Sequence, residues 1–177
     1  MKNIALLILA CFAGKWAPGQ FKPVDAASSV QFKIKNLGFT INGSFSGLQG
    51  TIKFDPTHLA DATVDVSIDA NTVNTDNSMR DDHLRKSDYF DVKNYPLIRF
   101  VSTGIASSNK ARVFFISGKL TMKDHTRDIS FPFTAKPSTE GWLFNGSFTV
   151  NRREFDIGGA SIIADNLEVS LNIIAKP

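Results

Sequence analysis

A dense group of ionisable side chains lies near the middle of this 177-residue sequence. Six consecutive residues supply two adjacent carboxylates, an imidazole and two guanidinium groups: Arg80, Asp81, Asp82, His83, Leu84 and Arg85. Carboxylates beside an imidazole can bind a metal ion or act as an acid–base pair. Guanidinium groups donate hydrogen bonds in a fork that suits phosphate. This group is therefore the first candidate for chemistry.

Three roles are open for this group. In the first, Asp82 and His83 act on a substrate or bind a metal, but a metal site normally needs three or four ligands, and the other two histidines have no motif spacing to His83. In the second, the alternating charges bond one another and cap backbone groups of a lid. In the third, Arg80, His83 or Arg85 donates to a phosphate or quinone oxygen of a bound ligand. We expect no catalytic residue and no metal.

Outside this group, apolar residues recur at every second position in one segment after another. This is the period of a strand with one buried face and one wet face. The pattern predicts about eight strands, over Val30–Ile34, Ile52–Phe54, Val64–Ile68, Ile98–Phe100, Arg112–Met122, Ile129–Phe133, Trp142–Val150 and Leu167–Ile173. Phe114 and Phe115 are adjacent and must point to opposite faces. Residues 16–23 are interpreted as a short lead-in.

No segment predicts a helix long enough to cover a face of such a sheet, so the apolar faces must cover one another. A sandwich and a closed barrel both achieve this. The one helical candidate is a turn or two around Ser78–Arg85, where a polar residue at 76–78 could cap the start and Met79 and Leu84 would face inward. We expect a single all-β antiparallel domain with this short helix as a lid.

Phenylalanine is the dominant aromatic residue, with 15 Phe against 2 Trp and 2 Tyr. Its ring is large and apolar and has no group that needs a hydrogen-bond partner in the interior. An eight-stranded barrel can be filled by such side chains or can hold a slim ligand between them, and the pattern alone leaves both open. The formal charge of +3 favours a membrane surface only weakly, and the scattered basic residues do not predict nucleic-acid binding.

The N-terminal residues have the features of a secretory leader. Lys2 precedes the apolar run Ile4–Ala10, which is too short to span a bilayer. We expect a leader within residues 1–19 and a folded domain over residues 20–177, periplasmic or secreted. Alternatively, Ile8-Leu9-Ala10-Cys11 resembles a bacterial lipoprotein box, in which case Cys11 is acylated and anchors the protein to a membrane. In either case the domain contains no cysteine.

One long run of the sequence resembles a known family. Residues 71–100 carry RDDHLR, SDYFD and YP in that order, and this run resembles the YceI-like, lipocalin-like proteins that bind polyisoprenoids. The resemblance extends to residues 30–55, 118–133 and 148–157. Residues 151–159 are similar to a late signature of the family, and Asp156 stands where the family tends to have Gly.

The resemblance implies a lipocalin-like antiparallel β-barrel of about eight strands that holds an isoprenoid tail, of a polyprenyl carrier lipid or a quinone, in its interior. The residues then expected to line the interior are Phe32, Ile34, Phe54, Ile68, Met79, Leu84, Phe90, Phe100, Leu120, Phe131, Phe133, Phe144, Phe148 and Phe155. The headgroup or lid residues are expected to be Arg80, Asp82, His83 and Arg85. No cofactor is expected besides the bound lipid or quinone.

Two functions of different classes remain open for such a barrel. The first is a carrier that stores or transports an isoprenoid lipid in the periplasm, with possible contact to a membrane surface. The second is a protein-interaction or structural module whose barrel is filled by its own side chains. The pattern of residues leaves the oligomeric state open.

Overall fold

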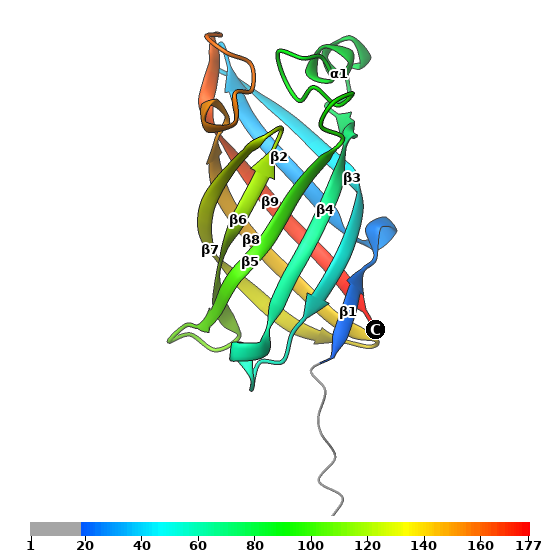
Figure 1. Ribbon diagram of the computed structural model, residues 1–177, viewed down its shortest axis with the longest axis vertical. Coiled ribbons are helices and arrows are strands. Elements are labelled where there is room, and N and C mark those ends of the chain that lie inside the picture. The colour runs from blue at the N-terminus through cyan, green and yellow to red at the C-terminus, as the bar shows by residue number, and fades with distance from the viewer. Residues whose placement is uncertain (1–18) are drawn as a thin grey trace, which may run out of the picture.

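The computed structural model describes residues 19–177, which form one antiparallel β-barrel (Figure 1). Its strands are β1 (Gln20–Pro23), β2 (Ser29–Asn36), β3 (Phe39–Lys53), β4 (Thr63–Asn74), β5 (Leu97–Ser107), β6 (Val113–Met122), β7 (His125–Ser138), β8 (Gly141–Asn151) and β9 (Ile163–Lys176). The helical elements are α1 (Ser78–Leu84) and the 3₁₀ turns η1 (Asp25–Ala27), η2 (Leu59–Asp61) and η3 (Arg152–Phe155). In the described part of the chain, no helix has the length and apolar character needed to cross a bilayer.

The sheet closes because β4, the last strand of the order, pairs with β3. On its other side β3 pairs with β1 and β2. Strands β1 and β2 occupy successive parts of one lane, since both pair with β3 and with β9. Nine strands therefore build an eight-lane barrel, which confirms the predicted fold. The interpretation of residues 16–23 as a lead-in is wrong for Gln20–Pro23, because Phe21 pairs with Ile52 and is buried.

The predicted alternation sets the two faces of the barrel wall. Phe114 is 7% exposed whereas its neighbour Phe115 is 46% exposed, so the two adjacent rings do point to opposite faces. In β7, Phe131 and Phe133 are buried and Ser130 is exposed. The period of two thus delivers the apolar side chains to the interior.

Two strand glycines make room for interior rings. Gly43 lies opposite Phe32 in the β2–β3 ladder, and a Cβ at this glycine would stand 2.2 Å from the Phe32 ring. A Cβ at Gly118 would likewise stand 2.4 Å from the Phe100 ring. Since real Cβ contacts do not approach so closely, glycine is what allows these rings to lie against the wall.

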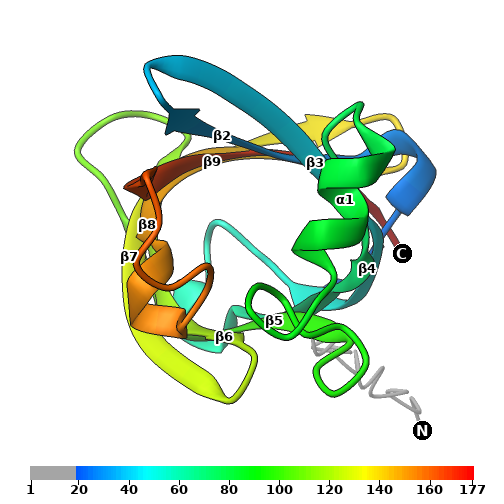
Figure 2. The ribbon, with the colours of Figure 1, turned by 90° about the horizontal axis from the view of Figure 1, so that it is seen from above.

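Seen from above, α1 and the loop that follows it lie over one side of the upper opening, and the η3 turn lies over the other (Figure 2). The turns between β2 and β3 and between β6 and β7 are also at this end, while the C-terminus is at the lower end (Figure 1). The two ends of the barrel are therefore built differently.

Candidate ligand cavity and its lid

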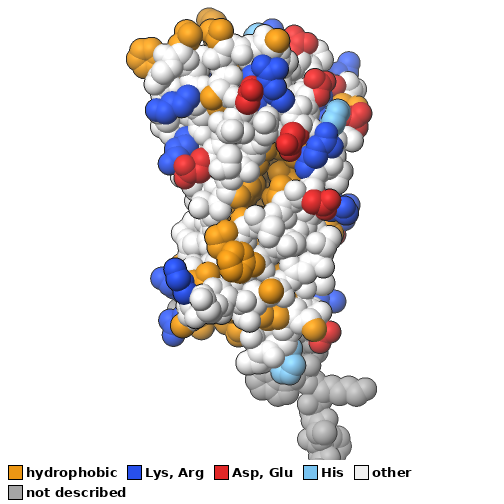
Figure 3. Space-filling model, turned by 90° about the vertical axis from the view of Figure 1, so that its left-hand side faces the viewer, with side chains coloured by type: hydrophobic (Ala, Val, Ile, Leu, Met, Phe, Trp, Pro, Cys, Tyr) orange, Lys and Arg blue, Asp and Glu red, His pale blue; other side chains and the backbone are white. Residues whose placement is uncertain are grey.

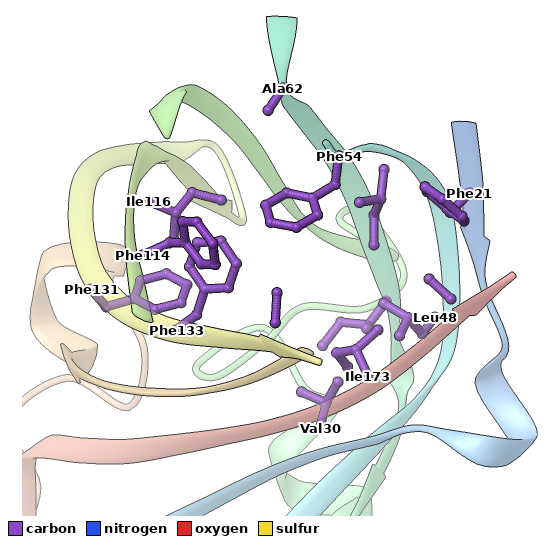
Figure 4. Packing of buried hydrophobic residues seen from close by; sticks show 14 residues of the cluster. Phe21, Val30, Leu48, Phe54, Ala62, Phe114, Ile116, Phe131, Phe133 and Ile173 are labelled. Atoms are coloured by element: carbon purple, nitrogen blue, oxygen red, sulfur yellow. The ribbon is translucent and has the colours of Figure 1, made fainter. Parts of the chain in front are cut away.

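An aromatic cluster, which we call the floor, closes the lower end of the barrel. Phe54, only 2% exposed, makes edge-on contacts at ring-centroid distances of 5.3 Å to Phe114, 6.0 Å to Phe133, 5.1 Å to Trp142 and 5.3 Å to Phe144. Figure 4 shows the Phe54 ring pointing inward toward Phe114. Edge-to-face packing is a favoured arrangement of aromatic rings. The lower end of the barrel is thus packed by its own side chains.

Above the floor lies a cavity of about 280 Å³, walled by residues from every strand from β2 to β9. Its roof is α1 with the loop that follows it, and we call this segment the lid. All but two of the predicted interior residues line it: Phe32, Ile34, Phe54, Ile68, Leu84, Phe90, Phe100, Leu120, Phe131, Phe133, Phe144 and Phe148. Most of the remaining wall is Val, Ile and Leu. The cavity is therefore an apolar space, and contact of these residues with a lipid stays a prediction.

Part of the wall comes from a segment that the sequence pattern did not single out. Ile41, Phe45 and Leu48 of β3 line the cavity, and the Phe45 ring packs 5.6 Å from Phe32 and 5.4 Å from Phe90. The alternation in β3 is broken by bulges between Ser44 and Gln49. A bulge changes the face to which the following residues point, and this hides the pattern. In the sequence, the large apolar side chain of Phe45 was the signal that could have identified this part of the wall.

Two predicted interior residues lie elsewhere. Met79 is 82% exposed, so the expectation that it faces inward is wrong. Arg80 and Leu84 are four residues apart in α1, and both face the cavity. Met79 directly precedes Arg80 and is rotated away from it by about 100° around the helix axis. Phe155, the last residue of η3, is 1% exposed and packs in a second cluster with Leu120 and Met122, among others. Leu120 and Met122 line the cavity, whereas Phe155 does not.

The lid is held to the rim by a buried polar contact. Asp81, 6% exposed, accepts hydrogen bonds from the N–H of Thr75 at 2.9 Å and from its hydroxyl at 2.5 Å. Arg80 donates to the Thr75 hydroxyl and carbonyl oxygens, each at 2.7 Å. Asn77 caps the start of α1 by accepting from the Arg80 N–H at 3.0 Å. Asp81 is the anchor that the sequence analysis did not single out.

Arg85 fixes the other end of α1 to the end of β4. It donates to the carbonyl oxygens of Asn71 at 2.8 Å and Val73 at 3.0 Å, and to Asp82 at 2.9 Å. The Asp82 side chain is 75% exposed. The second role considered above, in which the charges bond one another and the backbone, is the one that this geometry has.

The four expected headgroup or lid residues are not brought together around the cavity. Arg80 lines it, but its Nε and one terminal nitrogen already donate to Thr75. The His83 ring packs against Tyr89, with centroids 4.9 Å apart, and lies in a separate, more polar pocket with Asp88 and Asp156. Among residues 19–177, no group of three or more His, Cys, Asp and Glu side chains is placed to hold a metal ion.

Asn36 is a rim residue that the sequence analysis missed. It lines the cavity, and its side-chain oxygen is buried without a hydrogen-bond partner among the described residues. A buried acceptor without a partner is costly, and a ligand hydroxyl or N–H could satisfy it. Asn36 thus joins Thr75, Arg80, Tyr89 and Arg152 among the polar residues that line the cavity.

The rim opposite the lid is organised by a buried arginine. Arg152 is 3% exposed and donates to four carbonyl oxygens, those of Ile157, Gly159, Ile163 and Ala164, at 2.7 to 3.1 Å. These bonds hold the loop between η3 and β9 in place. These bonds give Arg152, which belongs to the late signature, a structural role that needs no ligand.

Asp156 adopts a left-handed conformation, with φ 51° and ψ 44°. Glycine tolerates this region best and aspartate tolerates it better than most residues, so the backbone that a glycine would favour is kept here. The Asp156 carbonyl oxygen accepts from Lys123 at 2.9 Å, and the same ammonium donates to the Ser87 carbonyl oxygen at 3.3 Å. Lys123 thereby links the η3 turn to the lid segment.

The barrel wall splits between β7 and β8. Within residues 125–151, all described, the two strands pair only from Phe133↔Gly146 down to Ser138↔Gly141. The Ala135 N–H points toward the β6 side. Because successive N–H groups of a strand point to opposite sides, the N–H of residue 132 would point toward β8. Residue 132 is Pro132, and proline has no N–H to donate. The rings of Phe131 and Phe148, 4.5 Å apart, cover the inner side of the split, and Figure 3 shows an apolar hollow on this face.

The carboxyl groups with a clearly lowered pKa lie away from the cavity. The pKa of Asp55, in the turn after Phe54, is lowered to about 2, mainly by hydrogen bonds from the side chain and backbone of Thr57. The pKa of Asp65 is lowered by a hydrogen bond from Arg99, and that of Glu140 by one from Lys176. These groups belong to the outer wall and the lower turns.

This architecture is shared with proteins from several bacteria. A family model described as a YceI-like domain matches residues 21–175. A UPF0312 protein of Pseudomonas savastanoi pv. phaseolicola is 30% identical over 150 residues, which cover 81% of this chain and 78% of that protein.

Solved structures resemble the barrel closely. BcnA of Burkholderia cenocepacia superposes with a TM-score of 0.80 at 27% identity, over 85% of this chain and 98% of that one. A polyisoprenoid-binding domain from Saccharophagus degradans superposes with a TM-score of 0.74 at 13% identity, over 88% of this chain and 97% of that one, and shows the fold alone. Since the family model spans nearly all of the barrel, the chain belongs to the YceI-like family.

Proposed function

We propose that this protein binds one isoprenoid lipid, of the polyprenyl-carrier or quinone type, and stores or transports it in the periplasm. The tail lies in the cavity between the aromatic floor and the lid. The headgroup lies at the rim, near Asn36, Thr75 and Arg80. The protein acts as a carrier and performs no chemistry on the lipid.

The observation that carries this proposal is the apolar cavity itself, which lies beneath the lid. At about 280 Å³ it lies near the lower end of the range of small-molecule pockets, roughly 300–1,000 Å³, so a slim chain suits it better than a broad fused-ring ligand. The related domain from Saccharophagus degradans, which is described as polyisoprenoid-binding, supports the same class of ligand.

Reversible loading follows from the energetics of such a cavity. Each methylene gains about 0.8 kcal/mol on leaving water, but a lipid tail already has this gain in a bilayer. Transfer from bilayer to cavity therefore changes the hydrophobic free energy little. Selectivity must come from the shape of the tail and from the polar groups at the rim.

The location rests on the N-terminal pattern. The proposed leader, with Cys11 as an alternative lipid anchor, falls on residues 1–19, of which 1–18 lie outside the described residues. The single cysteine of the chain is Cys11, so residues 19–177 have no thiol to oxidise. This composition suits an oxidising compartment.

The competing function, an interaction module with a self-filled barrel, is favoured by one observation. The floor around Phe54 is packed by its own rings, as a self-filled barrel would be. The two functions differ in what occupies the space above the floor.

Organic extraction and mass spectrometry of the protein purified from its natural host test the proposal. We expect an isoprenoid lipid at near-stoichiometric amount. Val169 faces the cavity, and Val169→Phe should displace the lipid by filling the space. Thr149, exposed on the neighbouring strand, provides the matched control, because Thr149→Phe adds the same ring outside.

Two results would overturn the proposal. One is the absence of isoprenoid above background from several independent extracts of the wild-type protein. The other is an equal lipid content in the wild-type protein and in Val169→Phe, which would place the bound lipid outside the cavity.

A further inference from the structure

Large apolar side chains stand exposed on the upper rim. Leu37, in the turn that joins β2 to β3, is 68% exposed, and Phe39, the first residue of β3, is 75% exposed. Ile162, just before β9, is 72% exposed. The two segments are neighbours, because Asn36 pairs with Phe39 on one side and with Ile163 on the other. We call Leu37, Phe39 and Ile162 the apolar tip. Apolar side chains are visible at this end in Figure 3.

The apolar tip lies in a part of the rim that has no charge. Residues 36–43 and 157–164 contain no Asp, Glu, Lys, Arg or His. The lid on the other side of the opening is rich in charge, with Asp76, Asp82 and Lys86 among its residues. The contrast between the two sides of one opening indicates that the uncharged side meets an apolar environment.

The fold does not explain the leucine at position 37. Leu37 has φ 49° and Gly38 has φ 83°, the conformation of a two-residue hairpin turn that favours Asn-Gly. Leucine is disfavoured at positive φ, and its exposed side chain adds nothing to the core. A polar residue such as asparagine would serve both the turn and the solvent better. The side chain therefore points to a contact outside the molecule.

We propose that the apolar tip inserts into the interfacial region of a lipid bilayer and seats the cavity rim on the membrane. Continuity with the cavity supports a bilayer as the occupant. Asn36, Ile41 and Ile163 line the cavity, while their neighbours Leu37 and Ile162 point outward. A tail could pass from the bilayer to the cavity along these two segments with little exposure to water.

The size of the apolar tip argues against a second copy of the chain as the occupant. Even if each of the three side chains presented the roughly 200 Å² of an aromatic ring, the total would stay below about 600 Å², less than the roughly 800 Å² that each partner buries in a standard interface. An interfacial anchor needs only a few apolar groups. Lys35, which donates to Thr40 at 2.7 Å directly behind the tip, adds attraction to anionic lipids.

This proposal rests on the proposed function only for what is exchanged at the membrane. Binding to vesicles is measured without any knowledge of the ligand. A protein that binds vesicles but never carries an isoprenoid would defeat the proposed function and leave the docking surface intact.

Co-sedimentation with vesicles tests the docking surface. We expect the purified protein to bind phosphatidylcholine vesicles, and to bind somewhat better when phosphatidylglycerol is included. The triple variant Leu37→Asn, Phe39→Thr, Ile162→Ser should lower the partition coefficient by about tenfold or more, because it removes the inserted apolar groups. Its melting temperature should stay close to that of the wild-type protein, since these side chains are exposed.

Phe115→Thr is the matched control. Phe115 is 46% exposed on the outer face of β6, near the lower end, so its loss should leave vesicle binding unchanged. Equal vesicle binding by the triple variant and the wild-type protein would overturn the proposal. So would a wild-type protein that ignores vesicles but forms a dimer that the triple variant cannot form, because the occupant would then be a second copy.

Discussion

The lower and upper parts of the barrel use the same strands for opposite purposes. Below, Phe54 is surrounded by four aromatic rings that fill the barrel. Above, the same alternation of inward side chains surrounds a cavity. Period-two patterning therefore determines which side chains point inward, and their size determines whether they meet.

The difference in size is visible in the composition of the two levels. Rings of Phe and Trp meet around Phe54 at the lower end, whereas the upper wall mixes rings such as Phe32 with aliphatic side chains, including Ile34 and Val169. Shorter side chains on opposite walls of an eight-stranded barrel cannot all touch. The upper opening must then be closed by other means, and the lid does this through polar contacts around Thr75 and Asp81.

The largest effect is expected from removing the centre of the floor. Phe54→Ala should destabilise the protein by about 3–5 kcal/mol, because it deletes a buried ring and leaves a cavity. Phe32→Ala, on the partly buried upper wall, should cost less than half as much. Chemical denaturation of both variants measures the difference. Equal losses would mean that the upper part is packed as tightly as the floor.

The next effect separates the two adjacent carboxylates of the lid. Asp81→Ala should cost about 2–3 kcal/mol, because it leaves the buried Thr75 N–H and hydroxyl without their acceptor. Asp82→Ala should cost less than about 0.5 kcal/mol, since its side chain is 75% exposed. Hydrogen exchange of α1 should rise in the first variant alone. Similar losses of stability and similar hydrogen exchange in the two variants would refute Asp81 as the lid anchor.

A smaller effect is expected at the boundary between the floor and the cavity. Phe133 belongs to both, so Phe133→Leu should cost about 1 kcal/mol and deepen the cavity. The lipid content or the bound tail length should change as well. Thr134→Ala on the outward side should do neither. A loss of stability with unaltered lipid content, measured by melting temperature and mass spectrometry, would argue that Phe133 is only packing.

The smallest effect concerns acid stability at the lower end. The pKa of Asp55 is lowered to about 2 by the hydrogen bonds from Thr57 and His58, against roughly 3.9 in an unfolded chain. A depressed folded pKa means that the carboxylate stabilises the fold above about pH 4, and this contribution is lost as pH falls toward 2. Melting curves of Asp55→Asn should therefore show a shallower loss between pH 4 and 2.

Asp61→Asn, an exposed neighbour in η2, controls for the change in net charge. Identical acid profiles for the wild-type protein and Asp55→Asn would remove Asp55 as a contributor. Since this site is part of the lower end, no change in lipid content should accompany it.

Much of the fold could be read from the sequence because strand periodicity is a local property. Alternation places Phe131 and Phe133 inside and requires Phe114 and Phe115 to point to opposite faces, and the structure agrees. The family was recognisable from short runs around RDDHLR and SDYFD, since these residues build the lid and its attachment to the rim. The apolar character of the interior was already present in the abundance of Phe.

Other features were decided only in three dimensions, where contacts join residues distant in sequence. Strand β1 exists because β3 and β9 leave an open lane beside it. Asp81 and Asp82 are chemically equivalent in sequence, and only the position of Thr75 buries the first. The hollow above the floor, the unpartnered Asn36 oxygen and the split at Pro132 likewise depend on how opposite walls meet. Local patterning determined the direction of each side chain, and the tertiary structure decided what it faces.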